Sequence, residues 1–345
     1  MSKRPVCIGA GLVALDVVIS GNSSCRSMFL AGGSCGNVLT ILSYLGWDSY
    51  PVARLSNNVA ADILLEDLQR WKVKSDLISV EIDGSTPVII HRILKGIHGE
   101  PKHKFEFKNP EDGKYLPSYK PTLAKSVPSI LAKVSGGNVF YFDRINRSAI
   151  EMAKSYKQKG LTVFFEPSSI KDINGFLECL HISDIVKFSN DRISNYQDLF
   201  PVGQVPLEIR TLGINGLQFR RIGMKSWHEV PSYSIENVVD SAGAGDWCTA
   251  GIINVLCNGE SINIFEYTDL DFIRALRFGQ TLSALNCTYE GARGLMYNVT
   301  EDILMAFANK VVFSKSNKIS ISELVVSDSM QPINDIKISS LLVPV

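Results

Sequence analysis

Short apolar runs rich in β-branched residues alternate with stretches of helical periodicity along most of the chain, and this alternation constrains the fold more than any other feature. A strand followed by a helix that leads back to a parallel neighbour is the unit that it predicts. The predicted strands cover residues 6–11, 139–143, 161–165, 184–189 and 207–212. The predicted helices cover residues 36–45, 60–71, 149–159 and 192–199. We therefore expect an α/β fold in which helices flank both faces of a mostly parallel central sheet.

One segment interrupts this alternation. Residues 87–95 and 101–108 each have an extended pattern without a helical period, and a short turn separates them. Such a hairpin, inserted in an α/β frame, is suited to cover a pocket as a lid. Residues 12–30 could supply further strands of the same lid. We expect a small β-sheet lid built from about residues 12–30 and 86–120.

The charges of the chain balance, with 35 Lys and Arg residues against 35 Asp and Glu residues and a formal net charge of zero. Non-specific binding of nucleic acid needs a basic excess or a basic face, so no nucleic acid is expected as a partner. The seven cysteines are scattered without a C-x-x-C pair, which is typical of a reducing compartment. No run of about 18 apolar residues is present to span a membrane. We therefore expect a cytoplasmic protein that does not bind membranes.

The strongest chemical signal is D-S-A-G-A-G-D at residues 240–246, followed by an apolar, helix-periodic stretch at 247–253. Small residues let backbone N–H groups converge on an anion, and the positive end of the following helix points at the same place. The segment therefore predicts a site for a phosphate or an oxyanion. Asp246, in the first helical turn, could accept a proton from a hydroxyl that attacks a phosphoryl group. The alternative is that Asp246 only caps the helix, and the spacing does not decide between the two.

A second signal is A-G-G-S-C-G-N-V at residues 31–38, ahead of an amphipathic helix. The Gly32-Gly33 turn lets the backbone approach a ligand closely, and Asn37 offers both a donor and an acceptor to sugar-type hydroxyls. The alternative is an ordinary strand-to-helix loop with Ser34 as the N-cap of the helix.

Together these segments resemble the ribokinase/PfkB family of carbohydrate and nucleoside kinases. Residues 240–246 match the family motif D-T-x-G-A-G-D with Ser241 in place of Thr, and residues 32–37 match G-G-K-x-x-N with Ser34 in place of Lys. Further matches follow in the family's order, at residues 45–47, 54–58, 211–216 and 290–292. The resemblance covers roughly residues 5 to 310 and implies a three-layer ribokinase-like fold. It makes residues 1–313 a kinase domain that includes the lid, with a C-terminal extension of unassigned role at 314–345.

The resemblance implies a function and a set of roles. The implied reaction is transfer of the γ-phosphate of ATP to a hydroxyl of a sugar, sugar derivative or nucleoside. Mg²⁺ would accompany the ATP, and a monovalent cation such as K⁺ near Asp240 is compatible with it. Asp246 would be the general base, and the backbone amides of Gly243, Ala244 and Gly245 would form the anion hole. The acceptor's hydroxyls would be held by Asp16, Gly32, Gly33 and Asn37.

Other positions are implied on the nucleotide side, namely Lys187, Ser189, Thr211, Gly213, Gly216 and Gln280. The family has N-x-x-E after the strand that contains Lys187, whereas Ser189 and Arg192 occupy those two positions here. Glu166, Asn190 or Asp191 could replace the missing carboxylate near magnesium, and Arg192 could itself contact phosphate. The lid segment 86–120 carries a small basic excess, so Arg144 is a candidate to hold an anionic group on the acceptor, or it forms a plain surface ion pair.

Two further patterns point elsewhere. G-x-G-x-x-A at residues 9–14 fits a dinucleotide-binding turn, but the helix and the later acidic residue that this turn requires are not predicted. Three of the five histidines, His91, His98 and His103, fall in the predicted lid. Their spacing does not guarantee that they converge on a metal, so solvated side chains are the better interpretation.

A rival function is compatible with the same motifs. The altered N-x-x-E segment and the extension at 314–345 would suit a catalytically degenerate member that binds nucleotide or sugar as a regulatory or structural protein. The intact motif at 240–246 argues against it, because a protein freed from catalysis has no need for a base beside an anion hole. The expected partners are therefore ATP and a small-molecule sugar or nucleoside. An exposed edge of the lid sheet could also pair with a second copy to form a homodimer.

Overall fold

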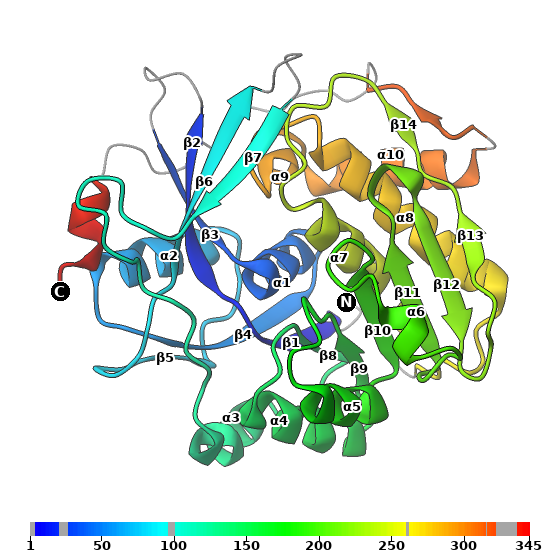
Figure 1. Cartoon of the computed structure of the whole chain (residues 1–345), viewed down its shortest axis with the longest axis horizontal. Helices are drawn as coiled ribbons and strands as arrows, with labels where there is room; N and C mark the ends of the chain where they lie inside the picture. Colours follow the sequence, from blue (N-terminus) through cyan, green and yellow to red (C-terminus); the bar gives the residue numbers. More distant parts are fainter. Residues whose placement is uncertain (1–3, 21–26, 96–100, 260–261, 315, 322–336) are drawn as a thin grey trace.

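The computed structural model describes residues 4–20, 27–95, 101–259, 262–314, 316–321 and 337–345 (Figure 1). Within these residues, the central sheet has nine strands in the order β13-β12-β11-β10-β9-β8-β1-β4-β5. Their bounds are Val6–Ala10 (β1), Asp48–Leu55 (β4), Ile78–Val80 (β5), Val139–Phe142 (β8), Thr162–Phe165 (β9), Ile185–Ser189 (β10), Leu207–Thr211 (β11), Leu217–Arg221 (β12) and His228–Val230 (β13). Strands β5 to β11 in this order are parallel, and β12 and β13 add an antiparallel edge. The predicted strands correspond to β1, β8, β9, β10 and β11.

Helices cover both faces of the sheet (Figure 1). They are Ser34–Tyr44 (α1), Val59–Arg70 (α2), Val127–Lys133 (α3), Arg147–Gln158 (α4), Ile173–Ile182 (α5), Tyr196–Leu199 (α6), Ala244–Leu256 (α7), Asp269–Asn286 (α8), Gly294–Asn298 (α9) and Glu301–Phe313 (α10). Side chains alternate between the two faces of a strand, so neighbours such as Cys7 and Ile8 enter different cores. One core packs against α1, α2, α7, α8 and α10, and the other packs against α3 to α6. The predicted three-layer α/β architecture is confirmed.

The helix predicted at 192–199 is wrong in its first half. Only Tyr196–Leu199 is helical, and the preceding segment forms turns in which the Arg192 and Ile193 amides both donate to the Ser189 carbonyl. The physical reason is the composition of residues 189–195, S-N-D-R-I-S-N, because Ser, Asn and Asp favour turns over helix interiors.

A second, four-stranded sheet stands apart from the central one in the order β3-β2-β6-β7. It consists of Met28–Gly32 (β3), Ala14–Ser20 (β2), Val88–Lys95 (β6) and Pro101–Glu106 (β7). Strand β2 pairs antiparallel with β3 and parallel with β6, and β6 pairs antiparallel with β7. The small separate sheet that the sequence predicts is therefore present. We call these four strands the lid sheet.

The described parts of the C-terminal extension pack against the α/β domain. Strand β15 (Lys318–Ile319) pairs with β14 (Ser234–Ile235), and a 3₁₀ turn at Ile338–Leu342 buries Leu341 against α2. The backbone then continues beside α2, where the Val59 amide donates to the Val343 carbonyl at 3.2 Å. Over the described ranges, no helix is both long and apolar enough to cross a bilayer.

Candidate active site

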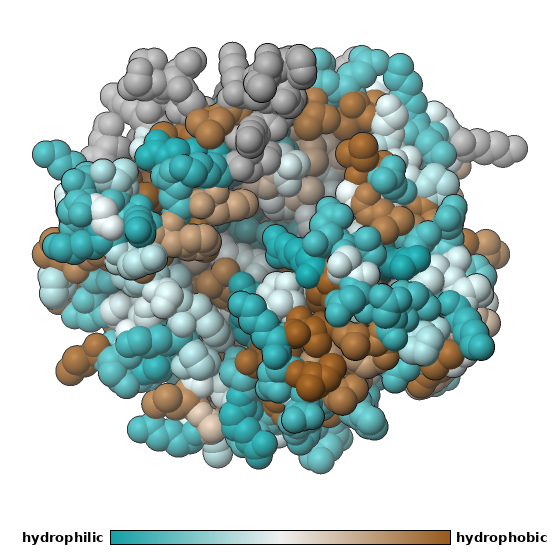
Figure 2. Space-filling model, viewed as in Figure 1, coloured by the Kyte–Doolittle hydropathy of each residue, from teal (hydrophilic) through white to brown (hydrophobic). Residues whose placement is uncertain are grey.

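A cavity of about 540 Å³ lies between the lid sheet and the carboxyl ends of the central strands. Figure 2 shows that this face of the molecule is hollowed between the two sheets. The lid contributes Ile89, His91, Phe105 and Phe107 to its walls. The loop before α7 contributes residues 241–246 from the opposite side. The lid sheet therefore covers the segment with the strongest chemical signal in the sequence.

The loop that leads into α7 is fixed by a buried carboxylate. Asp240 accepts from the amides of Ala242 (2.7 Å) and Gly291 (2.8 Å). Gly243 then adopts the left-handed conformation (φ 72°), and a side chain there would overlap the Ala292 carbonyl, so the loop requires glycine at this position. Of the three predicted anion-binding amides, that of Ala244 already donates to the Ser241 carbonyl at 3.3 Å. The amides that follow in the first turn have no acceptor within the helix, and they lie at its positive end.

Asp246 stands in the first turn of α7 and lines the cavity. The alternative that Asp246 only caps the helix is wrong, because the N-cap is Gly243 and no side chain caps it. Its Oδ2 instead accepts from Asn37 Nδ2 at 2.8 Å. Burial, reinforced by the nearby charge of Glu166, raises the pKa of Asp246 to about 8, although Asn37 and Lys187 oppose the shift. Asp246 is therefore a carboxyl group that can hold or release a proton near neutral pH.

Asn37 joins the two sequence signals. It is 4% exposed on α1 and lines the cavity, and its Nδ2 is committed to Asp246. Its Oδ1 has no hydrogen-bond partner within the described part of the chain. A buried acceptor without a donor is costly, so a donor from a bound molecule would stabilise this site.

Ser34 does not cap α1, which corrects the alternative interpretation of this loop. Gly33 is the N-cap of α1, with a φ of 75° and no side-chain cap bond. Ser34 Oγ donates instead to the carboxylate of Asp143, which also accepts from the Leu12 amide at 3.0 Å. Where the family motif has Lys, this chain therefore uses its Ser to hold a buried carboxylate.

Asp16, on β2, faces the same cavity and rests against the Gly32-Gly33 turn. A methyl group on Gly32 would overlap the Asp16 carboxylate, and the Gly33 amide donates to it. Burial raises the pKa of Asp16 to about 7, while the positive charge of Arg293 and the Gly33 amide lower it. Asp16 is thus a second cavity carboxyl group that titrates near neutral pH.

Lys187, on β10, and Glu166, directly after β9, form a pair that lines the cavity. Lys187 is 2% exposed, and its Nζ lies 2.5 Å from Glu166 Oε1 and 3.3 Å from the Gly245 carbonyl. The other oxygen of Glu166 accepts from Thr249 Oγ1 (2.7 Å) and from the Tyr141 hydroxyl (3.1 Å). Burial disfavours the ammonium of Lys187, but the adjacent Glu166 carboxylate offsets this and raises its pKa. The pair ties β9 and β10 to the first turn of α7.

The model of the pfkB family carbohydrate kinases matches residues 197–297, which include the loop at 240–246 and the start of α7. Over this segment the chain is similar to the PfkB family. PH1459 of Pyrococcus horikoshii, described as an uncharacterized sugar kinase, is 23% identical over 278 residues. That alignment covers 76% of this chain and 82% of PH1459. The family resemblance stated from the motifs is confirmed.

Solved structures of PfkB-like kinases share the fold. PH1459 superposes with a TM-score of 0.65 at 19% identity, covering 89% of this chain and 99% of that one. A fructokinase double mutant from Vibrio cholerae, solved with fructose, ADP and potassium, has a TM-score of 0.68 at 18% identity and covers 89% and 100%. The nucleoside kinase of Burkholderia thailandensis, solved with inosine, has a TM-score of 0.63 at 15% identity and covers 89% and 97%.

The structure gathers many of the PfkB-type site residues predicted from the sequence around one cavity. The walls include Asp16, Gly33, Asn37, Arg144, Glu166, Lys187, Ser189, Thr211, Gly243, Ala244, Gly245 and Asp246. Arg144 contacts Asp143, with its Nη1 at 2.9 Å from the carbonyl and 3.3 Å from the carboxylate. Arg192, which stands where the family has Glu, also lines the cavity.

Other predicted residues lie outside these walls. Gly32 packs closely against the Asp16 carboxylate. Gly213 and Gly216 flank a 3₁₀ turn after β11, and Gln280 is buried in α8, where it donates to the Val230 carbonyl at 3.4 Å. Of the lid histidines, His91 stacks on Phe105 with ring centroids 5.0 Å apart, and His98 lies outside the described residues.

Sequence reasoning missed the residues that a PfkB motif does not contain. The aromatic lid residues Phe105 and Phe107 carry no pattern beyond strand alternation. Arg293 was also missed, although it directly follows the matched segment at 290–292. The signal would have been that this arginine is buried, but the sequence around a single charged residue does not show whether it is buried.

Proposed function

We propose that the protein is an ATP-dependent kinase that transfers the γ-phosphate to a hydroxyl of a sugar, sugar derivative or nucleoside. One observation carries the proposal. The Asp246 carboxylate lies in the cavity at the amino end of α7, hydrogen-bonded to an asparagine whose other polar atom has no partner in the described chain. Similar structures add support, since PH1459 has been solved with ATP and the Vibrio cholerae fructokinase mutant with fructose and ADP.

The acceptor side of the proposed reaction uses Asp16, Asn37 and Asp246. The free Oδ1 of Asn37 would accept a hydrogen bond from one acceptor hydroxyl, and Asp16 would accept from another. Asp246 would take the proton from the attacking hydroxyl as its oxygen bonds to the γ-phosphorus and the bond from phosphorus to the bridging oxygen breaks. ADP leaves with that electron pair. A pKa near 8 gives Asp246 sufficient basicity for this step while leaving part of it ionised at neutral pH.

The donor side would neutralise charge locally. The amides of Gly243 and Gly245 and the amino end of α7 surround the place where the transferred phosphate develops charge. Ser189, Arg192 and Thr211 line the same side of the cavity and would contact the nucleotide phosphates. Gly213, Gly216 and Gln280 would extend this contact toward the base. This accounts for a phosphate-handling protein whose net charge is zero.

A magnesium ion fits this site only as a companion of the nucleotide. Within the described ranges, no three Asp, Glu, His or Cys side chains come together as a metal cluster. Mg²⁺ bound to nucleotide phosphates usually needs just one or two protein carboxylates and keeps several waters. Glu166 is the carboxylate that would hold it, because among the described residues only Lys187 donates to its Oε1, which retains a lone pair. The ion would supply positive charge that neutralises the nucleotide phosphates.

A second candidate is a degenerate family member that binds ligand without turnover. The observation that favours it is Arg192, a cation at the cavity where the family has a carboxylate. The two candidates differ in what they require of Asp246, because binding alone needs no base.

The test is ADP release over a panel of sugars, phosphosugars and nucleosides, with and without magnesium. Asp246→Asn should lower turnover by at least about two orders of magnitude, the usual reach of general-base catalysis, and leave ADP binding intact. The matched control is Asp62→Asn, which changes an exposed carboxylate in the first turn of α2 and should leave turnover unchanged. Retained turnover in Asp246→Asn would sink the assignment. Silence of the unaltered protein across the panel, with no rise in melting temperature on adding nucleotide, would favour the second candidate over kinase activity.

A further inference from the structure

Arg293 is a buried cation just outside the proposed active site. Its side chain is 1% exposed, and its Nη2 lies 2.5 Å from Oδ2 of Asp67 on α2. The same nitrogen donates to the Ala31 carbonyl at the end of β3, and the Ala31 amide donates back to Asp67 at 2.8 Å. Asp67 is held in turn by the Tyr297 hydroxyl at 3.0 Å. Arg293 and Asp67 thus clamp both backbone polar groups of Ala31.

This clamp acts on the acceptor side of the cavity. Ala31 directly precedes Gly32 and Gly33, and these two glycines form the surface on which the Asp16 carboxylate rests. There is no room for Gly32 to move toward Asp16, because even a methyl group at that position would overlap the carboxylate. Any shift of Ala31 would therefore change the place where Asp16 presents its oxygens to the cavity.

The residues before Arg293 hold the phosphate side of the cavity. The Gly291 amide donates to Asp240 at 2.8 Å. The Ala292 carbonyl accepts from Trp247 Nε1 at 3.1 Å and fits against Gly243, where a side chain would overlap it. Three consecutive residues, 291–293, therefore contact the anion-binding loop at one end and the acceptor-binding turn at the other.

Arg293 is incompletely satisfied, which a purely structural role does not explain. Its Nη1 is buried and has no hydrogen-bond partner in the described part of the chain. Burying a guanidinium with a free donor costs stability, and well-packed apolar residues often replace such pairs without loss. Its charge acts on Asp16, where it opposes the effect of burial on the pKa of that carboxyl group.

We propose that Arg293 is a positioning residue that fixes the acceptor-binding residues Asp16, Gly32 and Gly33 relative to the phosphate-side loop at 240–246. It acts through Ala31 and through its charge rather than by touching substrate. The inference rests on the proposed kinase function for its kinetic consequence, but its physical core, the coupling of Arg293 to Asp16, can be measured without any substrate.

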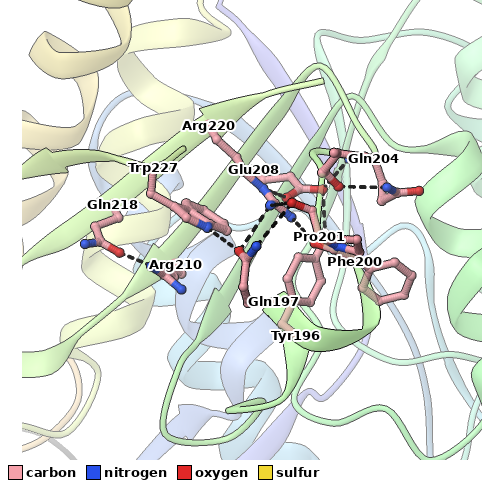
Figure 3. Close-up of polar contacts among 11 residues, drawn as sticks. Tyr196, Gln197, Phe200, Pro201, Gln204, Glu208, Arg210, Gln218, Arg220 and Trp227 are labelled. Carbon is pink, nitrogen blue, oxygen red and sulfur yellow. Dashed lines mark hydrogen bonds and ion pairs between the residues drawn. The ribbon is translucent and has the colours of Figure 1, made fainter. Parts of the chain in front are cut away.

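The first experiment is a double-mutant cycle on unfolding by urea at pH 8, with Arg293→Met and Asp16→Asn. Without the cation, the buried Asp16 charge is uncompensated. Adding Asp16→Asn to Arg293→Met should therefore lower the unfolding equilibrium constant at least about tenfold. The matched control is Arg220→Met, which breaks another fully buried arginine–carboxylate pair (Figure 3), neither member of which lines the cavity. In that background Asp16→Asn should have the same effect as in the unaltered protein. Additive effects in both cycles would overturn the proposal.

The second experiment measures kinetics, with D-fructose and inosine as the first acceptor probes. Arg293→Met should raise the acceptor KM at least about tenfold and leave the Kd of ADP within about twofold, and Arg293→Lys should recover part of the loss. If Arg293→Met does not fold, Arg293→Met with Asp67→Leu removes both charges and still loses the clamp. An unchanged acceptor KM, or an equal loss of ADP affinity, would contradict the positioning role. If the unaltered protein turns over no acceptor, the proposed function fails while the urea cycle still decides the coupling.

Discussion

Two buried arginine–carboxylate pairs lie in different parts of the molecule, and they differ in how completely their hydrogen-bonding groups are satisfied. Arg220 and Glu208 are both 0% exposed, and Arg220 donates to Glu208 (2.6 Å), to the Phe200 carbonyl (2.8 Å) and to Gln197 (3.2 Å) (Figure 3). Arg293 is as deeply buried beside Asp67 but keeps Nη1 without a partner in the described chain. We call the Arg220–Glu208 pair closed, because its polar atoms have hydrogen-bond partners, and the Arg293–Asp67 pair open, because Nη1 of Arg293 has none in the described chain.

The closed pair adds a side-chain link to the backbone pairing between β11 and the antiparallel strand β12. Glu208 on β11 also accepts from the Tyr196 hydroxyl (2.9 Å) and from the Gln204 amide (2.6 Å), so it ties the segment around α6 to the sheet. A network in which every member is satisfied rigidifies its surroundings and needs no further partner. The open pair lies behind the acceptor side of the cavity, where an incompletely satisfied cation can still act on Asp16. The two pairs therefore differ in hydrogen bonding, and the proposed positioning role falls on the pair that is incompletely satisfied.

The largest expected difference between the cavity and the Arg220–Glu208 pair is in how stability depends on pH. Asp246 and Asp16, with pKa values of about 8 and about 7, keep protons in the folded state that the unfolded chain releases above its ordinary pKa of 3.8. These two groups therefore bind more protons in the folded state between pH 4 and 8, and their contribution to stability falls as pH rises through that window.

Urea unfolding as a function of pH checks this expectation. Asp246→Asn should gain stability over the unaltered protein as pH rises from 4 to 8, and the difference should be constant above 8. The control is Arg220→Met with Glu208→Met, which removes both charges of a pair that does not line the cavity and should differ from the unaltered protein by the same amount at each pH. If the difference in stability between Asp246→Asn and the unaltered protein does not change with pH, burial does not shift the pKa of this carboxyl group.

Breaking the closed pair should give the next largest effect, on stability alone. Arg220→Met leaves Glu208 buried without its cation, and loss of one partner of such a pair costs about 3–5 kcal/mol. Urea unfolding measures it. Because neither residue lines the cavity, kcat and both KM values per folded molecule should not change. Adding Glu208→Met to Arg220→Met removes the uncompensated charge and should recover most of the loss. A loss below about 1 kcal/mol in Arg220→Met would mean that the pair contributes little.

On the acceptor side, Gly32→Ala should damage binding more than folding. The new methyl group would overlap the Asp16 carboxylate, and displacing that carboxylate should cost acceptor binding about 1–3 kcal/mol, which corresponds to a rise of about 5- to 150-fold in the acceptor KM. Gly36→Ala is the matched control four residues later, because a methyl there meets its nearest neighbour at 3.6 Å. Steady-state kinetics with the same acceptor compare the two. Equal KM values would show that Asp16 does not depend on the Gly32-Gly33 turn.

The sequence could predict what depends on local signals. The strands of the parallel sheet follow from apolar runs, and the placement of Asp246 follows from a glycine-rich loop that precedes a helix. The failed half of the helix at 192–199 shows the limit, because polar side chains there compete for the backbone. Arg293 and Asp67 lie 226 positions apart, so nothing near either residue indicates that they meet. The same holds for Glu208 and Arg220, which pair only because β11 and β12 bring them opposite one another.

The smallest expected effect tests whether the closed pair owes its rigidity to its hydrogen bonds. The guanidinium carbons of Arg210 and Arg220 lie 4.3 Å and 4.4 Å from the centroid of the Trp227 ring, whose Nε1 donates to Gln197 at 2.6 Å (Figure 3). Trp227→Phe keeps an aromatic face for both cations but removes this donor, so it should cost about 1 kcal/mol in urea unfolding. Trp227→Leu also removes the aromatic face and should cost more. If Phe and Leu are equally destabilising, the stacking of the two guanidinium groups on the ring adds nothing, and the hydrogen bond to Gln197 accounts for the contribution of Trp227. If Phe costs nothing, the closure of the network does not depend on the indole donor, and the contrast with the open pair at Arg293 weakens accordingly.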